Sequence, residues 1–214
     1  MTERISGIHH VTAITADGQK NIDFYAGVLG LRLVKVTVNF DDPQSYHLYY
    51  GDELGRPGTI MTFFVWPGAQ RGRLGSGQVT AISFSVPPGS LDYWSKRLDT
   101  ATRVPTRFGE QGLQVPDPDG VQLEIVTSLP QDQRTPWSGG PVPRQHAIRG
   151  FQGVSLSVEG YEHTAELLTH TLGFKFEGED GNRFRFVGDA PHAGVVDVLC
   201  VPDGIRGALV FRQR

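Results

Sequence analysis

The feature that most constrains this chain is an internal repeat. Residues 8–31 and 151–174 each read as an extended run, a helix-like run and a Leu-Gly pair followed by a hydrophobic residue. Val11 and Val154, like Leu29 and Leu172, are 143 positions apart, so the frame holds from strand to helix. Self-similarity of this kind indicates that one supersecondary unit is used more than once.

A third copy lies between these two. Residues 79–86 form a strand-like run, and Ser90 is placed to cap a helix whose apolar positions recur at helical spacing. A Pro-Asp-Pro-Asp-Gly turn at residues 116–120 then precedes a closing strand at 121–126. Each copy therefore predicts one strand, one helix and three further strands.

Residues typical of helix ends support this pattern in the outer copies. Asp17 is placed to cap the first helix, and Gly30 is placed to end it. Gly173 takes the corresponding place at the end of the third helix. The predicted fold class is therefore α+β, with three βαβββ modules and curved mixed sheets that can enclose a ligand or a metal.

The division of the chain follows from the modules. We expect an N-terminal domain at 5–128, made of modules at about 5–67 and 78–128. A linker at 129–149, rich in proline and without periodicity, precedes a third module at 150–202. Residues 203–214 form a tail that matches no module.

Composition excludes several classes of protein. The net charge of −3 leaves no basic surplus for nucleic acid, and the single cysteine excludes an internal disulfide. The sequence contains no signal-peptide-like stretch and no apolar run of membrane-spanning length. We expect a cytoplasmic protein that binds neither nucleic acid nor membrane.

The adjacent pair His9-His10 is the sharpest chemical signal. Neighbouring residues of a strand point to opposite faces, so we expect one of the two imidazoles to face a cavity. Imidazole is the commonest metal ligand, although a lone histidine on a strand more often has a structural role. Glu124 is either on a solvated strand face or a ligand across from His10. His47 is expected to be structural or exposed.

The βαβββ repeats with an early strand histidine resemble the vicinal oxygen chelate superfamily, which includes glyoxalase I, bleomycin and fosfomycin resistance proteins and extradiol dioxygenases. Several segments are similar to the ring-cleaving dioxygenases that act on hydroquinones. These segments include Gly7-Ile8-His9-His10-Val11-Thr12, Val38-Asn39-Phe40-Asp41-Asp42-Pro43, Tyr46-His47-Leu48-Tyr49-Tyr50-Gly51-Asp52 and Pro57-Gly58-Thr59-Ile60-Met61-Thr62-Phe63-Phe64.

The resemblance implies a non-haem enzyme with Fe(II), or another divalent metal such as Mn or Zn. It implies that His10 is a metal ligand and that Thr12 and His9 lie beside it, next to the substrate. The implied partners are a small aromatic substrate and O₂. The resemblance assigns no further catalytic residue on this chain.

In that family the first module pairs with a fourth and the second with the third, and the fourth supplies the other two ligands. The sequence after Val201 does not match a fourth module. We therefore expect an incomplete metal site, with metal weakly bound or absent, and low activity of an isolated monomer. We also expect a homo-oligomer in which copies of the first module cover each other.

Two other functions are compatible with the residues. In a glyoxalase-like isomerase or lyase, the first two modules would close on each other, and His10 and Glu124 would hold a divalent metal. In a non-catalytic binding protein of the resistance type, Phe63, Phe64 and Trp66 would line a stacking cavity.

Overall fold

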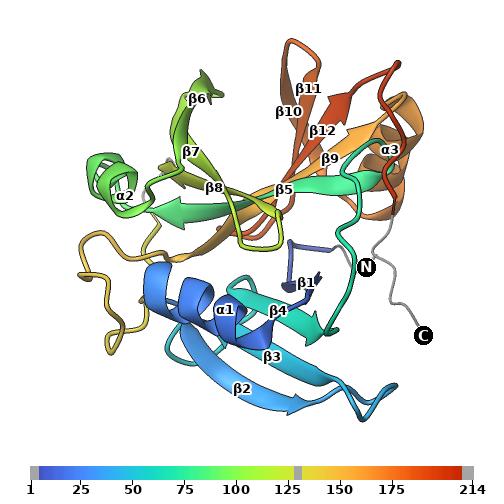
Figure 1. Cartoon of the computed structure of the whole chain (residues 1–214). Coiled ribbons are helices and arrows are strands. Elements are labelled where there is room, and N and C mark those ends of the chain that lie inside the picture. Colours follow the sequence, from blue (N-terminus) through green and yellow to red (C-terminus); the bar gives the residue numbers. More distant parts are fainter. Residues whose placement is uncertain (1–4, 128–131, 209–214) are drawn as a thin grey trace.

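The computed structural model describes residues 5–127 and 132–208, and in them the chain forms three βαβββ modules (Figure 1). Module one contains β1 (His10–Thr15), α1 (Gly18–Ile22), η1 (Asp23–Val28), β2 (Arg32–Val38), β3 (Tyr46–Gly51) and β4 (Ile60–Val65). Module two contains β5 (Gln78–Val86), α2 (Leu91–Arg97), β6 (Thr102–Arg107), β7 (Glu110–Pro116) and β8 (Gln122–Thr127). Module three contains β9 (Gly150–Val158), α3 (Glu162–Glu166), η2 (Leu167–Thr171), β10 (Lys175–Asp180), β11 (Arg183–Val187) and β12 (Val195–Cys200).

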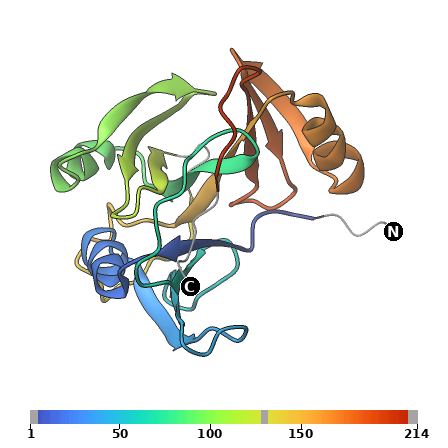
Figure 2. The same cartoon turned by 45° about the vertical axis from the view of Figure 1, so that its right-hand side comes forward.

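The strands form two sheets. Each module has the same internal order, in which the first strand pairs in parallel with the last, as β1 does with β4. Module one is a separate four-stranded sheet, whereas β5 and β9 pair antiparallel and join modules two and three into one eight-stranded sheet. Figure 2 shows the strands of modules two and three rising on either side of this junction. The sheets thus join the second module to the third, as the resemblance implied, and leave module one with a sheet of its own.

The helices of modules one and three share an irregularity that the sequence repeat did not predict. Each begins as a short α-helix and continues as a π-helix, with Leu29 N bonding to Phe24 O and Leu172 N to Leu167 O. Both helices are followed by a glycine with positive φ, +72° at Gly30 and +79° in module three, which ends the helix. The expected stops are therefore confirmed.

The caps of the helices differ. The Asp17 carboxylate accepts the N–H groups of residues 19 and 20, as expected. Ser90 stands at the start of α2, but its side chain caps nothing. Its hydroxyl instead donates to the carbonyl of Gln145, so the expected capping role is wrong. The segment 132–149, which packs beside α2, therefore supplies the acceptor for this hydroxyl.

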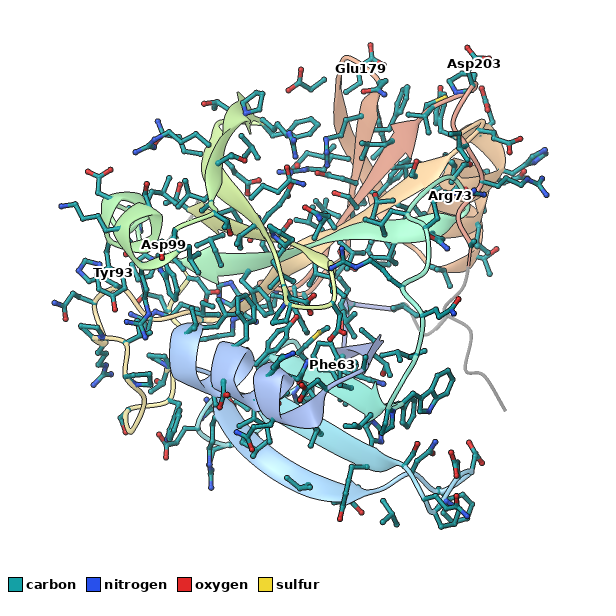
Figure 3. All side chains as sticks on the ribbon, viewed as in Figure 1. Phe63, Arg73, Tyr93, Asp99, Glu179 and Asp203 are labelled. Carbon is teal, nitrogen blue, oxygen red and sulfur yellow. The ribbon has the colours of Figure 1, made fainter. Side chains whose placement is uncertain are left out.

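The main core lies between module one and module two. Tyr25 and Leu29 from the first helix and Phe63 from β4 pack with Phe84 and Trp94 of module two. Phe63, labelled in Figure 3, lies beside α1 and the four-stranded sheet. The Tyr25 hydroxyl also donates to the buried Asp117 carboxylate, at 3.0 Å. The helix of module one is therefore packed between its own sheet and the neighbouring module, and the other face of that sheet is left open.

The segment between modules two and three has no helix or strand in residues 132–149, but it is packed. Val142, Ala147 and Ile148 are buried in the main core. The Arg134 guanidinium donates to the carbonyls of Gly58 and Phe151, at 2.8 and 2.6 Å. This segment therefore ties module one to module three.

The described part of the tail pairs with the connection between modules one and two. Arg73 and Ala208 exchange backbone hydrogen bonds, and Ser76 donates to the carbonyl of Ile205. Residues 209–214 of the expected tail lie outside the described residues. In the described ranges, no helix combines the length and apolar character that crossing a membrane requires.

Candidate functional site

The start of β1 is held by two backbone hydrogen bonds. Ile8 N donates to the carbonyl of Ala193 in module three, and Gly58 N donates to the carbonyl of His9, both at 2.8 Å. Gly58 has a φ of +82°, and a Cβ there would meet Ala193 and Arg134 at 3.0 and 3.3 Å. A glycine is therefore required at this close approach, which sets where His10 enters the sheet.

His9 and His10 do not separate to opposite faces as expected. Their Nδ1 atoms lie 3.1 Å apart, and their rings meet edge to face at a centroid distance of 5.2 Å. Strand alternation fails here because β1 begins at His10 and His9 lies just outside it. Both side chains are exposed, so the pair forms one polar unit at the end of the strand.

The open face of the four-stranded sheet begins at His10. Register places Thr12 beside Thr62, and Thr62 beside Tyr49, so their side chains form one row on this face. The Thr62 hydroxyl donates to the Thr12 hydroxyl at 2.9 Å. The next row contains Ile14, Phe64 and His47. We call the surface made by these two rows, His10 and Ile60 the His10 face.

His47 is the residue of this face whose role the sequence did not indicate. Its ring packs between Tyr49 and Phe64, at centroid distances of 4.2 and 4.1 Å, and its Nδ1 lies 2.9 Å from the Tyr49 hydroxyl. Burial, and to a lesser degree the charges of His10 and Lys35, lowers the pKa of His47. The alternation of residues 46–50 puts His47 and Tyr49 on one face, but only the sheet register places that face beside His10.

The metal that the resemblance implies can be tested against these donors. Within residues 5–127 and 132–208, no three His, Cys, Asp or Glu side chains come together to hold a metal ion. The His10 face thus offers imidazoles and hydroxyls but no carboxylate completing a site of two histidines and one carboxylate. The described residues alone do not fit a complete site of that kind.

Glu124 faces away from His10. It lies beside Ser83 in the eight-stranded sheet, accepts a hydrogen bond from the Ser83 hydroxyl at 2.8 Å and pairs with Arg107 at 2.8 Å. Its neighbours Leu123 and Ile125 point the other way, into the core shared with module one. Modules one and two therefore do not close on a common cavity, and the pairing of Glu124 with His10 that the glyoxalase-like alternative requires is not present in this structure.

Charged side chains that pair with one another line one side of the eight-stranded sheet. The Arg185 guanidinium makes two hydrogen bonds to Asp197 and one to Glu110, and Arg183 donates to Asp197 as well. Burial raises the pKa of Glu110 against the opposing effect of Arg185. A cavity of about 420 Å³ adjoins this network and is lined partly by Phe108, whose ring lies over Arg185. This side of the sheet is therefore neutralised by its own ion pairs.

The three aromatic residues expected to line one cavity are separated. Phe63 is fully buried in the core with Tyr25 and Tyr50. Phe64 is on the opposite side of the strand, against His47. Trp66 lies beyond the end of β4. Strand alternation therefore rules out a stacking cavity made by these three residues.

The fold agrees with comparisons to known proteins. The profile of the Glyoxalase/Bleomycin resistance protein/Dioxygenase superfamily matches residues 7–125. The chain belongs to this superfamily. The match covers modules one and two and includes both His10 and Glu124, which the structure places on different sheets.

Comparison with individual relatives narrows the class of protein within the superfamily. The chain is 47% identical over 209 residues to MhqO of Bacillus subtilis, which is named as a ring-cleaving dioxygenase; the alignment covers 95% of this chain and 66% of MhqO. It is 37% identical over 211 residues to the chlorohydroquinone/hydroquinone 1,2-dioxygenase of Sphingobium indicum, covering 95% of this chain and 66% of that protein. The chain thus spans about two thirds of the length of these curated relatives.

Solved structures of the superfamily carry the same fold. The crystal structure of a dioxygenase from Bacillus subtilis matches 98% of this chain and 68% of its own, with 44% identity and a TM-score of 0.92. Glyoxalase I from Zea mays matches 95% of this chain and 72% of its own, with a TM-score of 0.64 and 18% identity. The second comparison shows the fold alone.

Proposed function

We propose that this chain takes part in the ring cleavage of a hydroxylated aromatic compound, of the hydroquinone type, by O₂. Its similarity to hydroquinone and other ring-cleaving dioxygenases over nearly the whole chain carries this proposal. The reaction site is the His10 face, where exposed imidazoles and hydroxyls stand beside apolar side chains. Fe(II), or Mn or Zn in its place, is the proposed metal, and donors from outside the described residues complete its coordination.

The contact between His9 and His10 gives each a role. A hydrogen bond between two Nδ1 atoms needs one donor and one acceptor. When His10 Nδ1–H donates to His9, the His10 Nε2 lone pair is free to bind a metal. His9 is therefore proposed to fix the tautomer of His10, and Thr12, held by Thr62, to lie beside the substrate.

The role of His10 can be tested by mixing this chain with the part of MhqO that it does not match. The third of MhqO that this chain does not match would be supplied as a separate polypeptide, with Fe(II) and hydroquinone. We expect the chain alone to consume little O₂ and the mixture to form a ring-opened product, measured by an oxygen electrode and mass spectrometry. Loss of a residue that hydrogen-bonds to a metal ligand commonly lowers metal affinity or activity about 10–100-fold. Loss of the ligand itself in His10→Ala should therefore lower the rate more than about 100-fold.

His163→Ala is the matched control, because His163 is an exposed histidine on α3 of module three. This variant should keep the rate of the wild-type mixture. A His10→Ala variant with unchanged Fe(II) affinity and unchanged O₂ uptake would contradict the proposed role of His10. A mixture that binds iron through His10 but leaves hydroquinone intact would contradict the proposed reaction.

We also propose that β1 is an assembly edge. The first strands of modules two and three, β5 and β9, pair antiparallel with each other. Each uses the edge that is not paired with the last strand of its own module. The corresponding edge of β1 has no partner strand within residues 5–127 and 132–208. Because a free edge offers backbone donors and acceptors, a βαβββ module of a second copy can pair there.

We expect the purified chain to form a homodimer, because two copies of β1 can pair with each other as β5 pairs with β9. Sedimentation velocity over a range of concentrations measures this directly. The sedimentation coefficient should rise with concentration toward that of a 47-kDa particle, about twice the chain mass of 23.5 kDa. A single species of monomer mass throughout the range would contradict this assembly.

A further inference from the structure

The His10 face contains a polar pair that the proposed function leaves without a role. Tyr49 and His47 are two residues apart on β3 and lie on the same face as His10, Thr12 and Phe64. Tyr49 is half-buried, and the Lys35 ammonium lies 5.6 Å from the centre of its ring. The pair is therefore at the surface of the sheet and not in the core.

The two nitrogens of His47 have different surroundings. Nδ1 lies 2.9 Å from the Tyr49 hydroxyl, whereas Nε2 is buried and has no hydrogen-bond partner. The flanking rings of Tyr49 and Phe64 cover the imidazole. The position of the single proton on a neutral imidazole therefore decides which group is left unpaired.

A buried N–H without an acceptor is rarer in proteins than a buried acceptor without a donor. The proton is consequently better placed on Nδ1, which then donates to the Tyr49 oxygen. Burial, His10 and Lys35 all lower the pKa of His47, which favours the neutral ring. Only a neutral imidazole has two possible positions for its single ring proton. With its oxygen accepting from His47, the Tyr49 hydroxyl keeps its own proton for another acceptor.

We propose that Tyr49 is a substrate-binding residue whose hydroxyl donates a hydrogen bond to an oxygen of the bound aromatic compound, and that His47 is the positioning residue that orients it. Apolar side chains of the face, Ile14, Ile60 and Phe64, suit the aromatic ring. The positive charge of Lys35 beside Tyr49 favours an oxygen that carries negative charge, such as a phenolate. This inference rests on the proposed function, because it takes its ligand class from there.

The first test needs neither metal nor substrate. Long-range ¹H–¹⁵N spectra of the histidine side chains distinguish the two neutral tautomers. We expect His47 to be the Nδ1–H tautomer in the wild-type protein and to lose that preference in Tyr49→Phe. A wild-type His47 with its proton on Nε2 would overturn the proposed orientation of Tyr49.

The second test measures binding of hydroquinone to the metal-free protein by NMR shift titration. Loss of one hydrogen bond of ordinary strength should weaken binding about fivefold in Tyr49→Phe. His47→Leu should weaken it similarly, and His47→Gln, whose amide can donate to Tyr49, should restore part of the loss. Thermal unfolding of each variant would verify that it is folded.

Tyr46→Phe is the matched control, because Tyr46 is 60% exposed on the same strand but lies one position out of phase, on the opposite face. Its affinity for hydroquinone should equal that of the wild type. Equal affinity of Tyr49→Phe and wild type, or no detectable wild-type binding, would overturn the inference. Binding that depends on Tyr49 without any ring cleavage dependent on His10 would contradict only the proposed function.

Discussion

The Arg185→Met variant is expected to lose about 3–5 kcal/mol of unfolding free energy. Arg185 is 7% exposed and makes hydrogen bonds of 2.8–3.0 Å to Asp197 and Glu110. Methionine has similar length but leaves the buried Glu110 without its ion-pair partner and Asp197 with Arg183 alone. The cost comes from that unpaired charge, since desolvation of Glu110 already disfavours its ionised form.

Chemical denaturation at neutral pH would measure this loss, with Arg206→Met as the control. Arg206 is 84% exposed and pairs with Glu159 at 3.2 Å, so its removal should change stability by less than about 1 kcal/mol. Arg185→Lys keeps the charge but loses the forked geometry and should fall between the two. Equal stability of Arg185→Met and Arg206→Met would contradict a stabilising role for the network.

The Trp94→Ala variant is expected to lose about 3–5 kcal/mol as well, for a different reason. Trp94 is fully buried in the core between modules one and two, so alanine leaves a cavity there. Its indole N–H donates to the carbonyl of His146 at 2.8 Å, and the His146 ring stacks on Tyr93 at 4.5 Å. The substitution therefore loosens segment 132–149 together with the core.

Trp137→Ala tests this explanation, because Trp137 lies in the same segment but is only half-buried. Its effect on the unfolding midpoint should be clearly smaller. Limited proteolysis should cut segment 132–149 faster in Trp94→Ala than in the wild type. Unchanged proteolysis with a large loss of stability would mean that the cavity alone, and not the anchored segment, explains the effect.

The fold could be predicted largely from local pattern. The recurrence of residues 8–31 at 151–174 predicted repeated βαβββ modules, and Gly30 and Gly173 end their helices where expected. These features depend on spacing and on backbone conformation within one module, both of which the sequence records. The continuation into π-helix did not follow, because the apolar positions of segments of only five or six residues do not distinguish i→i+4 from i→i+5 hydrogen bonding.

The site could be predicted only in part. His10 was singled out from its place on a first strand, and the resemblance placed His9 beside it. The hydrogen bond between the two imidazoles and the nearness of His47 and Tyr49 were not predicted. His9 lies outside the strand, and His47 reaches the face only through the pairing of β3 with β4. Alternation gives the side of a strand, whereas register decides which residues of different strands become neighbours.

The sequence by itself determined the module, its three copies and the histidine that begins the first strand. The resemblance implied that the second module pairs with the third, but only the tertiary structure decided that module one forms a sheet of its own, and this placed Glu124 and His10 on different sheets. The physical reason is that each module has one free first-strand edge and one helix-covered face, and several pairings satisfy both. The choice among them depends on contacts between residues far apart in the chain, such as those of Arg134 with Gly58 and Phe151.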